Sequence, residues 1–128
     1  MPKILVVDDE RNMVRLLQVN LEREGYEVVT AFDGMEGLQK ARTENPDLVL
    51  LDITMPRMDG FEVLNVLKAN MDTSDMPVVI LTARSKDADV FQGYETGADA
   101  YLTKPLHPNE LTAVIRKMLN KRSDAPTE

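Results

Sequence analysis

The sequence predicts a doubly wound α/β domain, in which a five-stranded parallel sheet is covered by five helices on its two faces. Five short apolar runs alternate along the chain with five segments of helical periodicity, and the connections between them are short. Alternation of this kind gives a parallel sheet, because strand-to-strand crossovers are right-handed. The periodicity does not fix the strand order, but 2-1-3-4-5, the flavodoxin-like order, is the common solution for five strands.

The predicted strands are short runs of apolar, β-favouring residues. They span residues 3–7, 26–31, 47–52, 78–81 and 99–103. The third run is continuously apolar up to Asp52, which is typical of a central strand covered on both faces. Pro56 and Gly60 then break regular structure before the next helix. Because ligands bind at the carboxyl ends of the strands in open α/β sheets, Asp52 is a candidate functional residue.

The predicted helices carry recognisable start and stop signals. Gly25 stands where a glycine commonly ends a helix, and Asp33 begins a D-x-x-E helix start. Met35, Leu38 and Ala41 are expected on one face of that second helix. The five helices are expected over 11–24, from 33 to about 44, from 59 through 67, from about 86 to 96, and from 108 through 119.

Composition indicates a single globular domain, expected over residues 1–121, with a disordered tail or the start of a linker over 122–128. The chain has no cysteine, which excludes disulfides and thiolate metal sites. No apolar run reaches the roughly 18 residues that a membrane span needs, so we expect a cytoplasmic protein without membrane contact. The net charge of −7 argues against direct nucleic-acid binding. The tail is compatible with a complete protein and with one domain of a longer one.

Polar side chains follow four of the predicted strands, at the point where each strand ends. They are Asp8 and Asp9, then Asp52, then Thr82, then Lys104. Because the carboxyl ends of parallel strands meet at one sheet edge, we expect these groups to converge. Three close carboxylates repel one another unless a cation joins them, and oxygen ligands of this kind suit Mg²⁺. The sequence therefore predicts a magnesium site at this edge.

A metal-bound carboxylate beside a lysine and a hydroxyl can accept a phosphoryl group. Asp52 would attack phosphorus, while Mg²⁺ and Lys104 neutralise the charge that develops on the phosphoryl oxygens. The product would be an aspartyl phosphate. The added negative charge is a strong local perturbation, able to draw Thr82 and its loop inward.

Four motifs occur in order on the predicted strand ends: VVDDE, LLDITMPRMDG, ILTA and YLTKP. With them the chain, from residue 3 to about 120, resembles the receiver domain of bacterial two-component response regulators, of the chemotaxis-regulator type. The resemblance implies that Asp52 is the phosphoacceptor and that Asp9 ligates Mg²⁺ directly. It also implies that Asp8 acts through metal-bound water and that the backbone carbonyl of Thr54 completes the ligands.

The resemblance further implies a switch. Lys104 would clamp the phosphoryl group, and Thr82 and Tyr101 would move with it. The phosphoryl group would come from a sensor histidine kinase or a phosphotransfer protein. The face made by the fourth helix, fifth strand and fifth helix would then control a partner or output domain. Val90, Gln92 and Ala100 stand where many relatives of the winged-helix type carry charged dimer contacts, so a monomer or a weak phosphorylation-dependent dimer is expected.

Three other functions compete with this interpretation. A Mg²⁺-dependent phosphohydrolase with Asp52 as nucleophile is disfavoured, because Thr54 stands where the haloacid-dehalogenase type has a second aspartate as general acid. A nucleotide-binding module is set aside, because no glycine-rich phosphate loop follows the first strand. A phosphate-independent binding module is disfavoured, because the reactive positions are intact. We therefore expect a signalling protein, which catalyses its own phosphorylation and dephosphorylation, rather than an enzyme.

Overall fold

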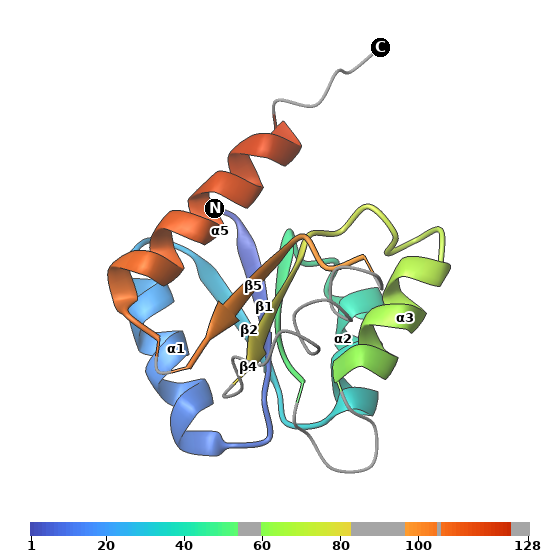
Figure 1. The fold of residues 1–128 in the computed structure, drawn as a ribbon, viewed down its shortest axis with the longest axis horizontal. Coiled ribbons are helices and arrows are strands. Elements are labelled where there is room, and N and C mark those ends of the chain that lie inside the picture. Colours follow the sequence, from blue (N-terminus) through green and yellow to red (C-terminus); the bar gives the residue numbers. More distant parts are fainter. Residues whose placement is uncertain (54–59, 83–96, 105, 124–128) are drawn as a thin grey trace.

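The computed structural model describes residues 1–53, 60–82, 97–104 and 106–123, with the side chains of 121–123 excepted. Its sheet has five parallel strands in the order β2-β1-β3-β4-β5, which confirms the predicted topology (Figure 1). The strands are β1 (Lys3–Val7), β2 (Glu27–Ala31), β3 (Leu48–Asp52), β4 (Val78–Thr82) and β5 (Ala100–Thr103). β3 lies between β1 and β4, so the strand that ends on Asp52 is the central one.

Four helices lie within the described residues, and they cover both faces of the sheet. They are α1 (Arg11–Arg23), α2 (Gly34–Thr43), α3 (Gly60–Ala69) and α5 (Pro108–Ser123). Helices α1 and α5 lie on one face, and α2 and α3 lie on the other (Figure 1). The helix predicted over 86–96 falls outside the described residues, as do the start predicted at Asp59 and the end of the tail. No helix in the described part of the chain is long and apolar enough to cross a membrane.

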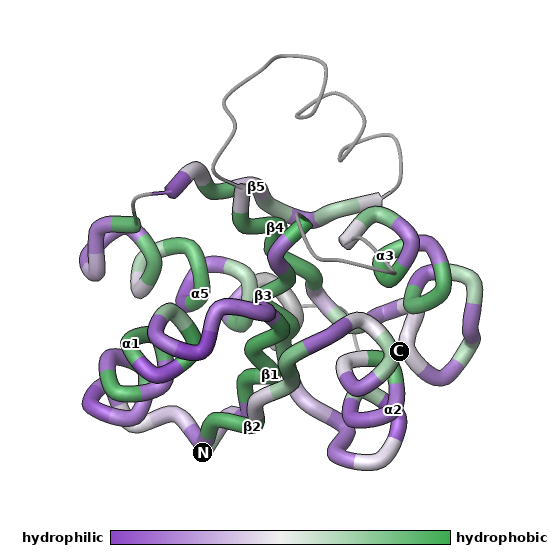
Figure 2. The backbone as a smooth tube through the Cα atoms, turned by 90° about the horizontal axis from the view of Figure 1, so that it is seen from below, coloured by the Kyte–Doolittle hydropathy of each residue, from purple (hydrophilic) through white to green (hydrophobic). Residues whose placement is uncertain are grey.

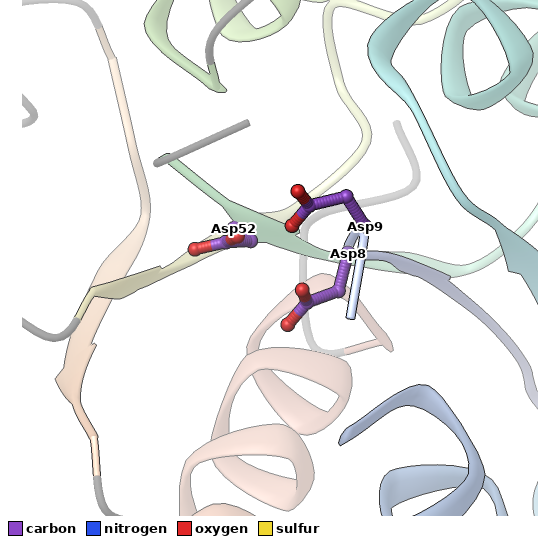
Figure 3. Close-up of side chains that lie close together, drawn as sticks. All are labelled: Asp8, Asp9 and Asp52. Atoms are coloured by element: carbon purple, nitrogen blue, oxygen red, sulfur yellow. The ribbon is translucent and has the colours of Figure 1, made fainter. Parts of the chain in front are cut away.

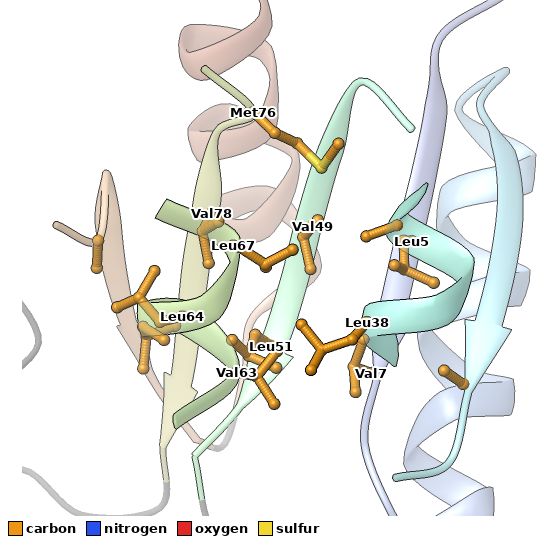
Figure 4. Close-up of a cluster of buried hydrophobic side chains, with 14 of the residues drawn as sticks. Leu5, Val7, Leu38, Val49, Leu51, Val63, Leu64, Leu67, Met76 and Val78 are labelled. Atoms are coloured by element: carbon orange, nitrogen blue, oxygen red, sulfur yellow. The ribbon is translucent and has the colours of Figure 1, made fainter. Parts of the chain in front are cut away.

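The core has two layers because successive strand residues point to opposite faces. Leu5, Val49 and Leu51 pack under α2 and α3 with Leu64, among others, as Figure 4 shows. The alternate residues of the same strands pack with α1 and α5 on the other face. Figure 2 shows the resulting pattern, with hydrophobic strands in the centre and hydrophilic segments outside. A sheet covered on both faces accounts for the continuously apolar strands.

Two predicted helix signals are confirmed in atomic detail. The Asp33 carboxylate accepts a hydrogen bond from the Glu36 backbone N–H at 2.8 Å, and the Glu36 carboxylate accepts one from the Phe32 N–H at 2.8 Å. Gly25 follows the end of α1 with a φ of +93°, in the left-handed region that favours glycine. These local devices fix where α1 ends and α2 begins, and thus where the chain returns to the sheet.

Of the three residues predicted on one face of α2, Leu38 and Ala41 are buried, whereas Met35 is 65% exposed. Helix α2 is buried through Gly34, Gly37, Leu38 and Ala41. Gly37 lets the helix lie close to β1, since a Cβ added there would lie 3.0 Å from the methyl groups of Val7. Helix α2 therefore faces the sheet through Gly37, Leu38 and Ala41, while Met35 is left largely exposed.

Candidate functional site

Three aspartates meet at the carboxyl ends of β1 and β3. Carboxylate oxygens of Asp8, Asp9 and Asp52 all lie within 4.8 Å of one another (Figure 3). Asp8 and Asp9 directly follow β1, and Asp52 is the last residue of the neighbouring strand β3. Asp8 and Asp52 are 0% and 2% exposed, whereas Asp9 is exposed. The three carboxylates thus lie together, as the sequence predicts, with one of them open to solvent.

Both carboxylate oxygens of Asp8 accept hydrogen bonds from the protein. Oδ1 accepts from the Glu10 backbone N–H at 3.0 Å, and Oδ2 accepts from the Lys104 ammonium at 3.1 Å. The first bond closes the turn between β1 and α1, because an aspartate side chain readily bonds the backbone two residues on. Asp8 is therefore held in one orientation, with neither oxygen lacking a protein partner.

Lys104 reaches the cluster from the residue after β5. Its ammonium lies 3.6 Å from an oxygen of Asp52, in addition to the bond with Asp8. Burial alone would lower the pKa of Lys104. Two effects outweigh burial and raise this pKa above the usual 10.5: the attraction of Asp52, and the hydrogen bond and attraction of Asp8. The lysine is thus a permanent cation at neutral pH, shared between two buried carboxylates.

The backbone joins Lys104 to Thr82. Thr82 is the last residue of β4 and is fully buried, and its carbonyl accepts a hydrogen bond from the Lys104 N–H at 2.6 Å. This bond continues the β4–β5 ladder one residue past the pair Thr82 and Thr103. Tyr101, which pairs with Ile80, is partly buried and packs with the α2–α3 layer. Thr54 lies outside the described residues.

The structure also brings Gly60 to the site, where the sequence predicted only a break before a helix. Gly60 is the buried first residue of α3, and its N–H donates to the Ile53 carbonyl at 3.2 Å. A Cβ at this position would lie 2.5 Å from the carbonyl oxygen of Asp52. The only trace of this contact in the sequence is a glycine eight residues after Asp52.

The donor set suits a hard divalent cation. Such cations take oxygen ligands, and Asp9 and Asp52 offer carboxylate oxygens within reach of one another. Two carboxylates at this distance repel each other in a buried setting, and a cation between them removes that repulsion. With Lys104 beside Asp52, the site can hold a metal and an anionic group side by side.

Comparison with known proteins places this geometry in a family. The sequence model of the response regulator receiver domain matches residues 4–116. The chain is 49% identical over 119 residues to the alkaline phosphatase synthesis transcriptional regulatory protein PhoP of Bacillus subtilis (strain 168), covering 93% of this chain and 49% of PhoP. It is 42% identical over 126 residues to the DNA-binding response regulator MtrA of Mycobacterium tuberculosis (strain H37Rv), covering 98% of this chain and 54% of MtrA. The chain thus spans about half the length of these curated relatives.

Solved structures agree with the sequence relatives. The fold matches the CheY-like response regulator receiver domain protein from Methanospirillum hungatei JF-1 with a TM-score of 0.92 and 32% identity, covering 98% of this chain and 99% of the other. It matches the chemotaxis protein CheY4 of Vibrio cholerae with a TM-score of 0.88 and 32% identity, covering 92% and 98% of the two chains. The family match spans all five strands and their carboxyl-terminal edge. The chain therefore belongs to the receiver domain family of two-component response regulators, the phosphorylation-dependent signalling switches.

Proposed function

We propose that Asp52 is the phosphoacceptor of this receiver domain and that a sensor histidine kinase or phosphotransfer protein is the donor. The observation that carries this proposal is the position of Asp52. It is a buried carboxylate at the end of the central strand, with an ammonium 3.6 Å away and two further carboxylates within 4.8 Å. A buried charge so placed is costly to the fold, and such groups are typical of functional sites.

In the proposed step, an oxygen of Asp52 attacks phosphorus in line. The bond from phosphorus to the donor imidazole nitrogen breaks, and the imidazole leaves with the electron pair and takes up a proton. Mg²⁺, when bound, would neutralise charge on the phosphoryl oxygens and align them. Lys104 stands where it can contact the same oxygens, because its ammonium already lies beside the attacking carboxylate.

The residues that would hold Mg²⁺ differ in exposure and in how many of their oxygens already accept hydrogen bonds. Asp9 is exposed at the cluster, so its carboxylate can turn toward a metal. Asp8 has both oxygens engaged, which supports a contact through metal-bound water rather than direct ligation. Asp52 and the Thr54 carbonyl would complete the protein ligands. Mg²⁺ keeps several waters in such sites, and the exposed side of the cluster at Asp9 leaves room for them.

The phosphoryl group would be read by residues at the ends of β4 and β5. We infer that Thr82 donates its hydroxyl to a phosphoryl oxygen and that Tyr101 moves inward with it. Thr82 is fully buried at the site, and its backbone carbonyl is bonded to Lys104. A displacement of Thr82 would therefore also move Lys104, and a displacement of Lys104 would move Thr82. The face that includes β5 and α5 would then present a changed surface to its target.

We propose that a partner protein or a further domain carries out the response to phosphorylation. Relatives whose names describe transcriptional or DNA-binding regulators are about twice as long as this chain. A net charge of −7 disfavours direct DNA contact by these 128 residues. We propose a cytoplasmic receiver over 1–121, with 122–128 as a tail or linker into which α5 continues as far as Ser123, acting as a monomer or a weak phosphorylation-dependent dimer.

The proposal is tested by intact mass after incubation with acetyl phosphate and Mg²⁺. The native domain should gain one phosphoryl group, about 80 Da, and the gain should require Mg²⁺. Asp52→Asn should gain nothing, while Asp33→Asn, which keeps a helix-capping oxygen away from the site, should behave as the native domain does. A native domain that never gains mass and never binds beryllofluoride would contradict the proposal.

The same assay addresses the competing functions. A phosphohydrolase would consume the donor without a lasting adduct, and beryllofluoride would separate a short-lived aspartyl phosphate from true turnover. Loss of the adduct over time measures the self-catalysed dephosphorylation expected of a signalling protein. Binding to a partner that is equal for the native domain and for Asp52→Asn would instead indicate a phosphate-independent module.

A further inference from the structure

Helix α3 begins in direct contact with the backbone that carries Asp52. Gly60, its first residue, is buried and donates its N–H to the carbonyl of Ile53, the residue after Asp52, at 3.2 Å. A Cβ built on Gly60 would lie 2.5 Å from the Asp52 carbonyl oxygen and 2.5 Å from the Ile53 Cα. Real Cβ atoms essentially never approach other heavy atoms so closely, so only glycine fits this arrangement.

The atoms that meet Gly60 are backbone atoms, which distinguishes it from the other close glycine. At Gly37, an added Cβ would meet methyl groups of Val7 at 3.0 Å, and a side chain can turn or shift to relieve that contact. At Gly60, relief requires the end of β3 and the start of α3 to separate. Ordinary carbon contacts begin near 3.5 Å, so the separation would be about 1 Å.

The displacement would fall on Asp52, because the rest of β3 is fixed. β3 pairs with β1 on one side and with β4 on the other, and Asp52 is paired with Leu81 at the last position of the strand. The Ile53 N–H donates to the Leu81 carbonyl at 3.2 Å, which ties this end of β3 to β4. A helix pushed against this end therefore turns or shifts the residue that bears the carboxylate, while the paired interior of the strand resists.

We propose that Gly60 is a positioning residue for phosphoryl transfer. Because Gly60 has no side chain, α3 can pack directly on the Asp52 backbone and hold it where the carboxylate faces the other acids and Lys104. This inference rests on the proposed role of Asp52 and adds a residue that touches neither phosphoryl group nor metal. The tolerance is small, because Asp52 lies only 3.6 Å from the ammonium. A shift of about 1 Å in a reacting group typically lowers a rate about 100-fold.

The test compares Gly60→Ala with two controls that disturb the same layer. Gly37→Ala makes the same chemical change against a side chain, and Leu67→Ala removes buried contacts from α3 about two turns along the helix from Gly60. The rate of mass gain from acetyl phosphate is measured at saturating Mg²⁺, well below each unfolding temperature. The second readout is the Mg²⁺ concentration that half-shifts the Asp52 carboxyl ¹³C resonance. Gly60→Ala should lower the rate about 100-fold and raise the Mg²⁺ midpoint about tenfold, while both controls should keep the native values.

Three outcomes overturn the inference. Native rate and native Mg²⁺ midpoint in Gly60→Ala would show that Asp52 tolerates the displacement. If Leu67→Ala changed the rate and the Mg²⁺ midpoint as much as Gly60→Ala does, the effect would come from lost stability rather than from the position of Asp52. If Gly60→Ala unfolds in buffer, both readouts are taken in sucrose, which favours the compact state; failure to fold there too would assign the glycine to the fold alone. A native domain without any mass gain would defeat the proposed function instead, and the Mg²⁺ midpoint would still test the placement of Asp52.

Discussion

Replacing Lys104 by methionine is expected to destabilise the domain by about 3 kcal/mol, because it strands two buried carboxylates. The ammonium lies 3.1 Å from Asp8 and 3.6 Å from Asp52, and these residues are 0% and 2% exposed. Methionine is an unbranched side chain one heavy atom shorter than lysine, and it carries no charge. The two buried carboxylates would then face each other, and Asp9, with no cation between them.

The magnitude follows from the two distances. With an effective dielectric constant of roughly 20, each ion pair is worth about 5 kcal/mol of Coulomb energy. Part of that is offset, because the lysine itself no longer has to be buried and water can enter toward the carboxylates. Measured losses for one partner of a buried pair are roughly 3 to 5 kcal/mol, and the lower end suits a cluster with one exposed member.

Urea unfolding followed by far-ultraviolet circular dichroism gives the free energy of unfolding for the native domain and for Lys104→Met. Lys3→Met is the matched control, because Lys3 also has two carboxylate partners, Glu27 at 3.8 Å and Glu44 at 3.5 Å, but both of those are exposed. The control should lose no more than about 1 kcal/mol. Equal losses in the two variants, or a loss below about 0.5 kcal/mol for Lys104→Met, would refute the reasoning from burial.

The difference in unfolding free energy between the native domain and Lys104→Met has a defined pH dependence. The pKa of Lys104 is raised above 10.5 in the folded domain, so between the unfolded and folded pKa values the folded state binds more protons than the unfolded state. Stability from Lys104 is therefore fully present below about pH 10.5 and is lost as the pH rises through the folded pKa. The difference between the native domain and Lys104→Met should stay constant from pH 7 to 10 and narrow above that range. A difference that narrows between pH 7 and 9 would contradict the assignment to Lys104.

Three further predictions concern the metal and the sheet edge opposite the site. Mg²⁺ at 100 times its dissociation constant should raise the free energy of unfolding by about 2.7 kcal/mol, and Asp9→Asn should reduce that gain at the same Mg²⁺ concentration in urea titrations. Asp99 accepts hydrogen bonds from the Val78 N–H at 2.8 Å and from the Lys68 ammonium at 3.1 Å, and Asp99→Ala removes this acceptor. The free energy of unfolding should fall by about 1 to 2 kcal/mol. The Val78 amide should exchange faster, and the phosphorylation rate should be unchanged. Thr73→Val removes a buried hydroxyl that donates to a carbonyl of α3 at 2.6 Å, and calorimetric unfolding should report a loss of about 1 to 2 kcal/mol.

The sequence predicts the fold and the gathering of acids because both follow from periodicity. Strands that are apolar on both faces and alternate with helices require a covered parallel sheet, and the end of each strand then falls at one edge. Asp8 and Asp52 are placed at this edge by counting residues to the end of an apolar run. No detail of packing is needed for that step, so the sequence alone is sufficient.

The sequence does not predict what depends on the approach of two backbones or on side-chain reach. Gly60 looks like a helix breaker in the sequence, because its contact with Asp52 arises only when α3 folds back on β3. Lys104 is expected beside Asp52, yet its shorter contact is with Asp8, because the bond to the Glu10 N–H holds Asp8 toward it. Met35 shares a helical face with Leu38 and Ala41 in the sequence, but α2 approaches β1 at Gly37 and Met35 stays exposed. Each case is decided by distances of less than a few ångströms between distant segments.

The charges at the strand ends explain how the site can act as a switch. Three carboxylates and one ammonium give the cluster a net charge of −2 around two almost fully buried acids. A divalent cation would balance this charge, and an acyl phosphate at Asp52, as proposed, would then add about one further negative charge. In a partly buried site, each such change is worth several kcal/mol, the scale needed to shift a two-state equilibrium from mostly one state to mostly the other. The Lys104 backbone N–H donates to the Thr82 carbonyl, so the groups proposed to respond to this charge are joined to the ends of β4 and β5. In the proposed switch, this backbone bond would carry the electrostatic change to the face that includes β5 and α5.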